Sequence, residues 1–206
     1  LLLLIGFLYI LVFGGLSYLR REGLSFRFAV EAVIFTLFVS GLIKITSYTL
    51  NPVIFLIVLY LITMRVRLLV DLGNFFAIRE NYRLAESFYN MAMNLWPDQS
   101  GRLITTMNKG TLRLKQGSID EAIQIYKGVL QQAAQGYLGV KYEAATHYNL
   151  GIAYLRKKMD AQARVEFNAV LDCSPSSEYA SKAEAALTQL RQQEKPSELD
   201  KNSLVD

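Results

Sequence analysis

The sequence predicts an all-α protein in which N-terminal transmembrane helices are followed by a stack of helix pairs. Three observations lead to this prediction. The chain is 52% hydrophobic, and the apolar excess lies before Arg65. A spacing of glycine, alanine, aromatic and proline residues recurs between residues 66 and 177, and a helix with one apolar stripe follows it. We therefore expect a membrane anchor over 1–65, a repeat stack with a capping helix over 66–194, and a polar tail over 195–206.

The anchor is expected to contain three membrane helices, at about 1–19, 26–43 and 52–65. Residues 1–19 carry no charge and would span about 28 Å as a helix, close to the thickness of a bilayer core. The third segment is short, but Asn51-Pro52 is a favourable helix start. Arginines at its end can extend to the headgroups. Whether the second and third helices fully cross the bilayer stays open.

Basic residues are unevenly distributed between the two ends of these helices. Lys44 lies in the loop between the second and third helices, whereas the opposite ends carry Arg20, Arg21, Arg27, Arg65 and Arg67. Short loops rich in Lys and Arg are retained in the cytoplasm. The repeat domain of this integral membrane protein is therefore expected on the cytoplasmic side. The first segment also differs from a signal peptide, because no basic residue precedes it and the Arg20-Arg21 pair stands where a cleavage site would lie. Since the chain does not begin with methionine, further residues or helices can precede Leu1.

The third apolar helix is expected to continue into the first helix of the repeat stack. Residues 53–72 contain neither glycine nor proline, the residues that most often end or kink a helix. An unbroken helix would seat the repeat stack directly on the membrane surface.

The repeat spacing is measured from three glycines, Gly73, Gly110 and Gly151. In the first repeat, residues 3, 12, 16, 19 and 24 positions after the glycine are Phe76, Ala85, Tyr89, Ala92 and Pro97; in the third they are Tyr154, Ala163, Phe167, Val170 and Pro175. The second repeat has Arg113, Ala122, Tyr126, Val129 and Ala134. Glycine permits two helices to cross closely, alanine faces it from the second helix, and proline ends that helix. The aromatic residues are expected to fill the gap between successive pairs.

These positions resemble those of the tetratricopeptide repeat family over residues 66–177. The resemblance implies helix pairs that we place at 66–79 with 82–95, 102–115 with 118–133, and 140–157 with 160–173. Two departures lie in the second repeat, where Lys109 and Arg113 replace apolar residues and are expected to loosen the stack. The intervals from Gly73 to Gly110 and from Gly110 to Gly151 also exceed the repeat length of the family, which is about 34 residues. A capping helix is expected over 178–193, with an apolar stripe of Ala180, Ala183, Ala186, Leu187 and Leu190.

The resemblance also implies a concave groove, lined by the first helix of each pair, that holds an extended peptide from a protein partner. By position, this partner groove would present Arg67, Asn74, Met107, Asn108, Thr111, Lys115, Tyr148, Asn149 and Arg156. Asn74 and Asn108 match asparagines that help chaperone-binding members to clamp a C-terminal carboxylate. Those members also use three cationic residues. The corresponding positions here are Val70, Ala145 and Asn149, which argues against a chaperone tail.

The chain offers few residues for catalysis or for a cofactor. His147 is its only histidine and Cys173 its only cysteine, so a His/Cys metal cluster cannot form within one chain. No phosphate-binding loop or nucleophile motif is present. The net charge is only +4 without a basic stripe, which argues against nucleic acid as a partner. We expect no catalytic, cofactor or metal site, and no enzyme activity.

The sequence favours a membrane-anchored scaffold, assembly factor or accessory subunit that binds other proteins of a membrane complex and the lipid bilayer. One alternative is a membrane-embedded transport or enzyme component that uses Glu31 and Lys44, because charged residues in membrane helices are often functional. Another is a receptor-like adaptor for soluble clients. The sequence does not identify the partner, and it leaves binding through the groove or through the outer face open.

Overall fold

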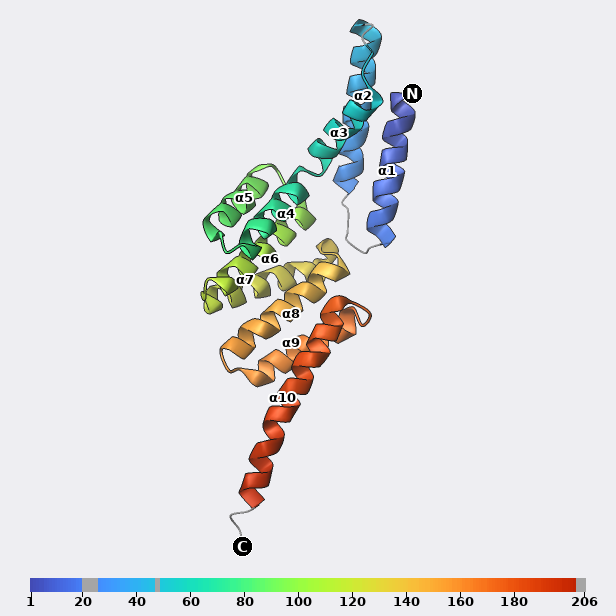
Figure 1. The fold of residues 1–206 in the computed structure, drawn as a ribbon. Coiled ribbons are helices and arrows are strands. Elements are labelled where there is room, and N and C mark those ends of the chain that lie inside the picture. Colours follow the sequence, from blue (N-terminus) through green and yellow to red (C-terminus); the bar gives the residue numbers. More distant parts are fainter. Residues whose placement is uncertain (20–25, 47–48, 203–206) are drawn as a thin grey trace.

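The computed structural model describes residues 1–19, 26–46 and 49–202, and these form an elongated, all-helical molecule (Figure 1). Arg20 and Arg21, used above for the orientation, lie outside the described residues. The three N-terminal helices, which the sequence predicts to be a membrane anchor and which are called the anchor below, are α1 (Leu2–Leu19), α2 (Phe26–Thr46) and α3 (Pro52–Thr63). The array consists of α4 (Arg65–Ile78), α5 (Tyr82–Asn94), α6 (Gln99–Lys115), α7 (Ile119–Gln132), the π-helical turn η1 (Ala133–Tyr137), α8 (Val140–Arg156), α9 (Asp160–Cys173) and α10 (Glu178–Asn202). The anchor projects from one end of the array and α10 from the other.

The three anchor helices pack around a small core of their own. Phe55 and Leu59 of α3 are fully buried, together with Ala32 of α2. The Tyr9 hydroxyl of α1 is hydrogen-bonded to Thr63 Oγ1 at 2.6 Å. Among the described residues, α2 is the one helix that is both long and apolar enough to cross a membrane, and only 17% of its apolar stretch is buried. With 12 residues, α3 reaches about 18 Å and is too short to cross alone.

The expected continuous helix from the anchor into the array is wrong. The chain breaks at Met64, and α3 and α4 meet at an angle of 73°. Thr63 Oγ1 donates to Leu59 O at 2.8 Å, and Arg65 Nη1 donates to Ile62 O at 2.6 Å. A polar side chain that inserts into the backbone ladder is a known cause of helix kinks, so the break arises without glycine or proline.

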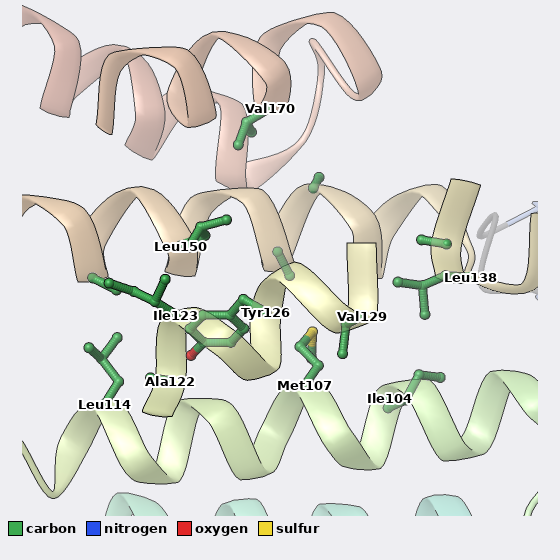
Figure 2. Packing of buried hydrophobic residues seen from close by; sticks show 14 of the residues in the cluster. Ile104, Met107, Leu114, Ala122, Ile123, Tyr126, Val129, Leu138, Leu150 and Val170 are labelled. Carbon is green, nitrogen blue, oxygen red and sulfur yellow. The ribbon is translucent and has the colours of Figure 1, made fainter. Parts of the chain in front are cut away.

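Each helix pair of the array is held by a glycine that faces an aromatic ring. A Cβ on Gly73 would lie 2.3 Å from Tyr89 Cε1, and a Cβ on Gly151 would lie 2.6 Å from Phe167 Cε1. Gly110 faces Tyr126 in the same way. The ring at position 16 therefore packs over the glycine of its own pair as well as toward the next pair (Figure 2). Ala85, Ala122 and Ala163 are fully buried beside these contacts.

The core of the array runs unbroken through the three pairs. Figure 2 shows the Tyr126 ring between α6 and α8, with Met107 on one side and Leu150 on the other. Because each pair packs only against its neighbours, the array is a solenoid whose stability depends on the joints between successive pairs.

The unequal glycine spacings have two structural causes. Compared with α4, helices α6 and α8 begin about one turn earlier relative to their glycines. The connection from α7 to α8 is also longer than the one from α5 to α6, because it contains the π-helical turn with Gly136 at φ 83°. Both additions lie outside the glycine–ring contact, so the pairs keep the same packing.

Arg113 strengthens the second repeat, contrary to the expectation. Its guanidinium pairs with Glu86 of α5 at 2.5 Å and with Glu121 of α7 at 3.0 Å, and so ties the first pair to the second. The positive charge of Lys109 also acts on Glu86. An ion-pair network thus occupies the joint to the preceding pair, where the third repeat has Tyr154 at the same position.

The final helix caps the array and runs further than expected. Its stripe of Ala180, Ala183, Leu187 and Leu190 is buried against the third pair. The helix continues to Asn202, so most of the expected polar tail is helical. Glu and Lys in this segment are good helix formers, and the helix continues although the segment also contains Pro196.

The glycine–ring contact predicts opposite effects of one substitution at two helical glycines. Gly151→Ala places a Cβ against Phe167 and should lower the free energy of unfolding by about 1–3 kcal/mol. Gly128→Ala, where a Cβ meets nothing within 4 Å, should raise it by about 0.5–1 kcal/mol. Urea unfolding of the full chain in detergent, followed by circular dichroism, measures both. Equal effects of the two changes would contradict the packing role of Gly151.

The Arg113–Glu86 pair predicts a pH-dependent contribution to stability. The hydrogen bond from Arg113 holds the pKa of the Glu86 carboxyl below its usual range. A lowered folded-state pKa contributes stability above the ordinary pKa of glutamate, and this contribution is lost as the pH falls through the folded-state pKa. Glu86→Gln should therefore lower the free energy of unfolding at pH 7 by about 0.5 kcal/mol, since the pair is partly exposed. The difference should disappear in acid. The exposed Glu184→Gln is the control, and a pH-independent loss in Glu86→Gln would refute this role.

Candidate functional site

A groove of about 440 Å³ opens on the concave side of the array, where the array meets the anchor. Its floor comes from the first helix of each pair, and its far end is closed by Tyr179 of the capping helix. The anchor contributes Phe13 and Tyr60, so the groove has one wall from each part of the molecule. The array side is formed by Val66, Arg67, Leu68, Val70, Asp71, Asn74, Gly101, Ile104, Met107, Asn108, Lys141, Tyr142 and Ala145.

The groove contains four of the nine residues that the sequence placed in it. These are Arg67, Asn74, Met107 and Asn108. The remaining five, which do not line this groove, are Thr111, Lys115, Tyr148, Asn149 and Arg156. The structure thus concentrates the candidate site at the anchor end of the array.

Lys115 and Arg156 cap helix ends inside the array. Lys115 Nζ donates to Ala77 O at 3.3 Å, and Arg156 Nη1 donates to Leu114 O at 2.6 Å. Each cation thus satisfies a carbonyl in the last turn of the preceding pair's first helix, where positive charge is favourable. The two residues hold successive pairs together, so their replacement would lower the stability of the array in addition to any effect on ligand binding.

The polarity of the residue after each glycine matches the ring that covers that glycine. Tyr89 donates a hydrogen bond to Asn74 Oδ1 at 2.7 Å, and Tyr126 donates one to Thr111 Oγ1 at 3.1 Å. In the third pair the ring is Phe167, and the residue after the glycine is the apolar Ile152. Burial raises the pKa of Tyr89 to about 12, so its hydroxyl stays a donor at neutral pH.

Two amides of the groove keep complementary hydrogen-bonding capacity. Asn74 uses its oxygen to accept from Tyr89, which leaves its NH₂ group for a ligand. Asn108 uses its nitrogen to donate to Ile104 O at 2.8 Å, which leaves its oxygen for a ligand. One donor and one acceptor on neighbouring helices match the C=O and N–H of an extended backbone.

Asn149 and Tyr148 serve contacts within the stack. Asn149 Nδ2 donates to Thr111 Oγ1 at 3.3 Å, between the second and third pairs. The Tyr148 ring lies 5.8 Å from the rings of both Phe167 and Tyr179 and so fixes the capping helix.

Sequence reasoning missed the aromatic and cationic residues at the two ends of the groove. Lys141 and Tyr142 lie in the extra first turn of α8, and the long glycine spacing was a signal for that turn. Phe13 and Tyr60 carried no such signal, because they reach the groove only through the packing of the anchor against the array.

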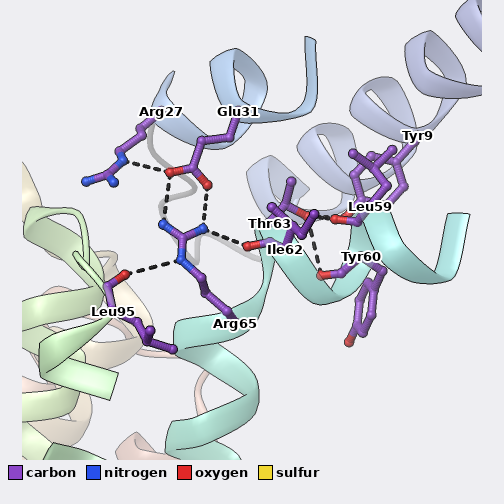
Figure 3. A network of polar contacts seen from close by, with 9 residues as sticks. All are labelled: Tyr9, Arg27, Glu31, Leu59, Tyr60, Ile62, Thr63, Arg65 and Leu95. Carbon is purple, nitrogen blue, oxygen red and sulfur yellow. Dashed lines mark hydrogen bonds and ion pairs between the residues drawn. The ribbon is translucent and has the colours of Figure 1, made fainter. Parts of the chain in front are cut away.

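Arg65 makes the joint between the anchor and the array (Figure 3). Its guanidinium binds both carboxylate oxygens of Glu31 in α2, at 2.6 and 3.0 Å. Arg65 Nε donates to Leu95 O at the end of α5 at 3.2 Å. Arg27 adds a second ion pair to Glu31 at 2.9 Å. Because this bidentate pair is strong and directional, it fixes the orientation of α4 relative to the anchor.

The remaining reactive side chains do not gather into a centre. His147 Nδ1 lies 2.7 Å from Glu166 Oε2, and Cys173 is a free, partly buried thiol whose pKa is raised by burial. Within the described residues, no three side chains of His, Cys, Asp or Glu come together in a way that could hold a metal ion. The groove is therefore the candidate functional site.

Comparison with known proteins supports the repeat assignment. Residues 101–176 match the family model described as tetratricopeptide repeat. No curated protein sequence matches the chain. The matched range comprises the second and third pairs, the two that carry the longer first helices.

Two solved structures are similar to the chain. The TPR2AB domain of yeast Sti1, solved as a complex with pHSP90, has a TM-score of 0.54 at 17% identity. The match covers 65% of this chain and half the length of that one. The N-terminal domain of stress-induced protein-1 from C. elegans has a TM-score of 0.47 at 18% identity, with 60% and 95% covered. At these identities the likeness to Sti1 concerns the fold alone. Residues 101–176 therefore match the tetratricopeptide repeat family, and they lie within a helical array whose fold is similar to that of a tetratricopeptide repeat domain.

Proposed function

We propose that this protein is a membrane-anchored scaffold, assembly factor or accessory subunit that binds an extended segment of a partner protein beside the bilayer. The observation that carries this proposal is the shared groove, which has Phe13 and Tyr60 of the anchor on one side and the repeat helices on the other. A segment bound there lies at the base of the anchor. Suitable partners are proteins of the same membrane complex.

The exposed apolar surface of the first helices supports a membrane anchor. Residues such as Phe7 of α1 and Ile34 and Phe38 of α2 are 58–63% exposed. A core helix of a water-soluble protein would bury such side chains, and large exposed apolar surfaces mark interaction sites or membranes. The sides of α2 that the other two helices do not cover are apolar and therefore suited to contact with lipid.

The distribution of basic residues supports a cytoplasmic array. Arg27 and Arg65 both bind Glu31, so they lie together at the end of the anchor that adjoins the array. Lys44 lies in the last turn of α2, at the opposite end. This asymmetry follows the positive-inside rule for an array in the cytoplasm.

The groove favours a backbone ligand over a chaperone tail. The free NH₂ group of Asn74 and the free oxygen of Asn108 suit one peptide unit of an extended chain. Val70 and Ala145, where chaperone-binding repeats would need cations, are apolar and more than 95% buried. The yeast Sti1 domain was solved with pHSP90, but this groove has apolar Val70 and Ala145 at two of the positions where chaperone-binding repeats carry cations.

A transport or enzyme site built on Glu31 and Lys44 is disfavoured. The two residues are 13 positions apart on one helix, which separates them by about 20 Å. Glu31 is also committed to Arg65 and Arg27. A receptor-like adaptor would use the same groove and differ from a permanent subunit in how long the partner stays bound.

Peptide binding tests the groove directly. We would select extended peptides from a displayed library against the full chain in lipid nanodiscs and measure their affinity by calorimetry. Asn74→Asp keeps the oxygen that accepts from Tyr89 but replaces the NH₂ donor by a second anionic oxygen. It should weaken the selected peptides about tenfold or more.

Asn90→Asp is the matched control, because it makes the same change of charge on the exposed side of α5. It should leave the affinity unchanged. Equal affinity of the wild type and Asn74→Asp for every selected peptide would show that the groove is not the binding site.

A further inference from the structure

The first repeat carries an exposed apolar surface beside the anchor. We define the repeat-one surface by six residues that are 42% exposed or more: Leu72, Phe75, Leu84, Met91, Leu95 and Trp96. Trp96, in the connection after α5, is 81% exposed. The stacked rings of Phe76 and Phe88 join its α4 side to its α5 side. The surface is therefore continuous across the first helix pair.

Equivalent positions in the other repeats do not form such a surface. Leu84 and Met91 on the outer side of α5 correspond to Glu121 and Gly128 in the second repeat and to Gln162 and Ala169 in the third. Leu72 corresponds to Leu150 in the third repeat, and Phe75 corresponds to Leu112 in the second. Both of these residues are about 99% buried under the preceding pair. The first pair has no preceding pair, and a solenoid end exposed to water normally has a polar face. Among the described residues, bulky apolar side chains are thus exposed at these positions only in the pair nearest the anchor.

The surface lies level with the end of the anchor. Trp96 lines a small cavity of about 50 Å³ together with Arg27, Phe28 and Met64, where α2 begins and α3 ends. The bend between α3 and α4 is 73°, so an α3 that follows the bilayer normal would direct α4 closer to the plane of the bilayer than to its normal. Figure 1 shows α4 and α5 at the end of the array from which the anchor projects.

Charged groups border the surface in the manner of an interfacial helix. Arg79 lies with its guanidinium 3.8 Å from the centre of the Phe75 ring, and Arg83 is exposed on the first turn of α5. Such helices insert apolar side chains at the boundary of headgroups and acyl chains while cations bind anionic headgroups. Tryptophan is enriched at this depth, because its ring is apolar and its N–H needs a polar partner.

We propose that the repeat-one surface rests in the interfacial layer of the bilayer and holds the array against the membrane. The occupant is lipid, because Trp96 lies beside Arg27 and Phe28 at the start of α2, so the surface adjoins the helix whose apolar side chains are largely exposed. This inference depends on the membrane anchor of the proposed function. It adds a second membrane contact, made by the repeats themselves, that fixes the height of the groove above the bilayer.

The chain supplies its own probe, since Trp96 is its only tryptophan. The full chain would be reconstituted into vesicles of phosphatidylcholine and phosphatidylglycerol that contain lipids brominated either near the headgroup or deep in the acyl chain. Flotation at alkaline pH first establishes whether the protein is integral. We expect floated protein to lose most of its Trp96 emission to the shallow bromolipid, less to the deep one, and little to aqueous iodide.

A pair of variants separates contact from mere proximity. Leu84→Ser with Met91→Ser should reduce bromolipid quenching and increase quenching by iodide. Val165→Ser, which removes a 66% exposed apolar residue from the outer side of the third repeat, should change neither.

Three outcomes would overturn the inference. Floated protein whose emission is quenched by iodide and not by bromolipid would keep its anchor but have no lipid contact at the first repeat. Floated protein shielded from both quenchers would have another protein or a second copy on this surface. Failure to float would refute the membrane anchor itself, and the inference with it.

Discussion

The bidentate ion pair between Arg65 and Glu31 is the interaction on which the arrangement of this molecule depends. A partly buried charge pair stabilises a fold only when its remaining hydrogen-bonding groups are also satisfied. Here the guanidinium also binds Ile62 O at the end of α3 and Leu95 O at the end of α5. One side chain therefore joins three helix ends, and it does so at the point where the helix from the anchor breaks.

The bend at Met64 determines how the array faces the anchor, and so whether the two parts share a groove. Because α4 leaves α3 at 73°, the concave side of the array faces Phe13 and Tyr60, and the groove receives walls from both parts. The same bend turns the outer side of the first pair toward the level of the anchor's end. A straight helix would have separated the groove from the anchor and raised the first repeat away from it.

Within the array, apolar and polar contacts have different roles. The glycine–ring contacts fix the geometry of each pair, and they recur with little change at Gly73, Gly110 and Gly151. The contacts between pairs vary, and several are polar: Arg113 binds Glu86, Lys115 binds Ala77 O, and Arg156 binds Leu114 O. A solenoid needs both kinds, since each pair is stabilised mainly by its nearest neighbours.

The sequence predicted what depends on local spacing and failed where a distant partner decides. The glycine spacing predicted the helices of all three pairs close to their observed bounds, because a glycine followed 16 positions later by an aromatic residue is a pattern that recurs in the sequence. The break at Met64 has no such sequence pattern, because Arg65 is a good helix former and its partner Glu31 lies far away in the sequence. Lys115 and Arg156 were assigned to the groove because position gives the face of a helix but not the carbonyl that a long side chain reaches.

The role of Arg65 in fixing the array relative to the anchor is tested most directly by distances between spin labels on these two parts of the molecule. Labels would be attached at Ile34→Cys of α2 and Val165→Cys of α9, two exposed positions, in a Cys173→Ser background, with the full chain in nanodiscs. A single narrow distance distribution is expected for the parent protein and for Arg27→Ala, which removes only the outer ion pair. Arg65→Ala should broaden the distribution. A broad distribution in the parent, or a narrow one that Arg65→Ala leaves unchanged, would contradict the role of Arg65 as the joint between anchor and array.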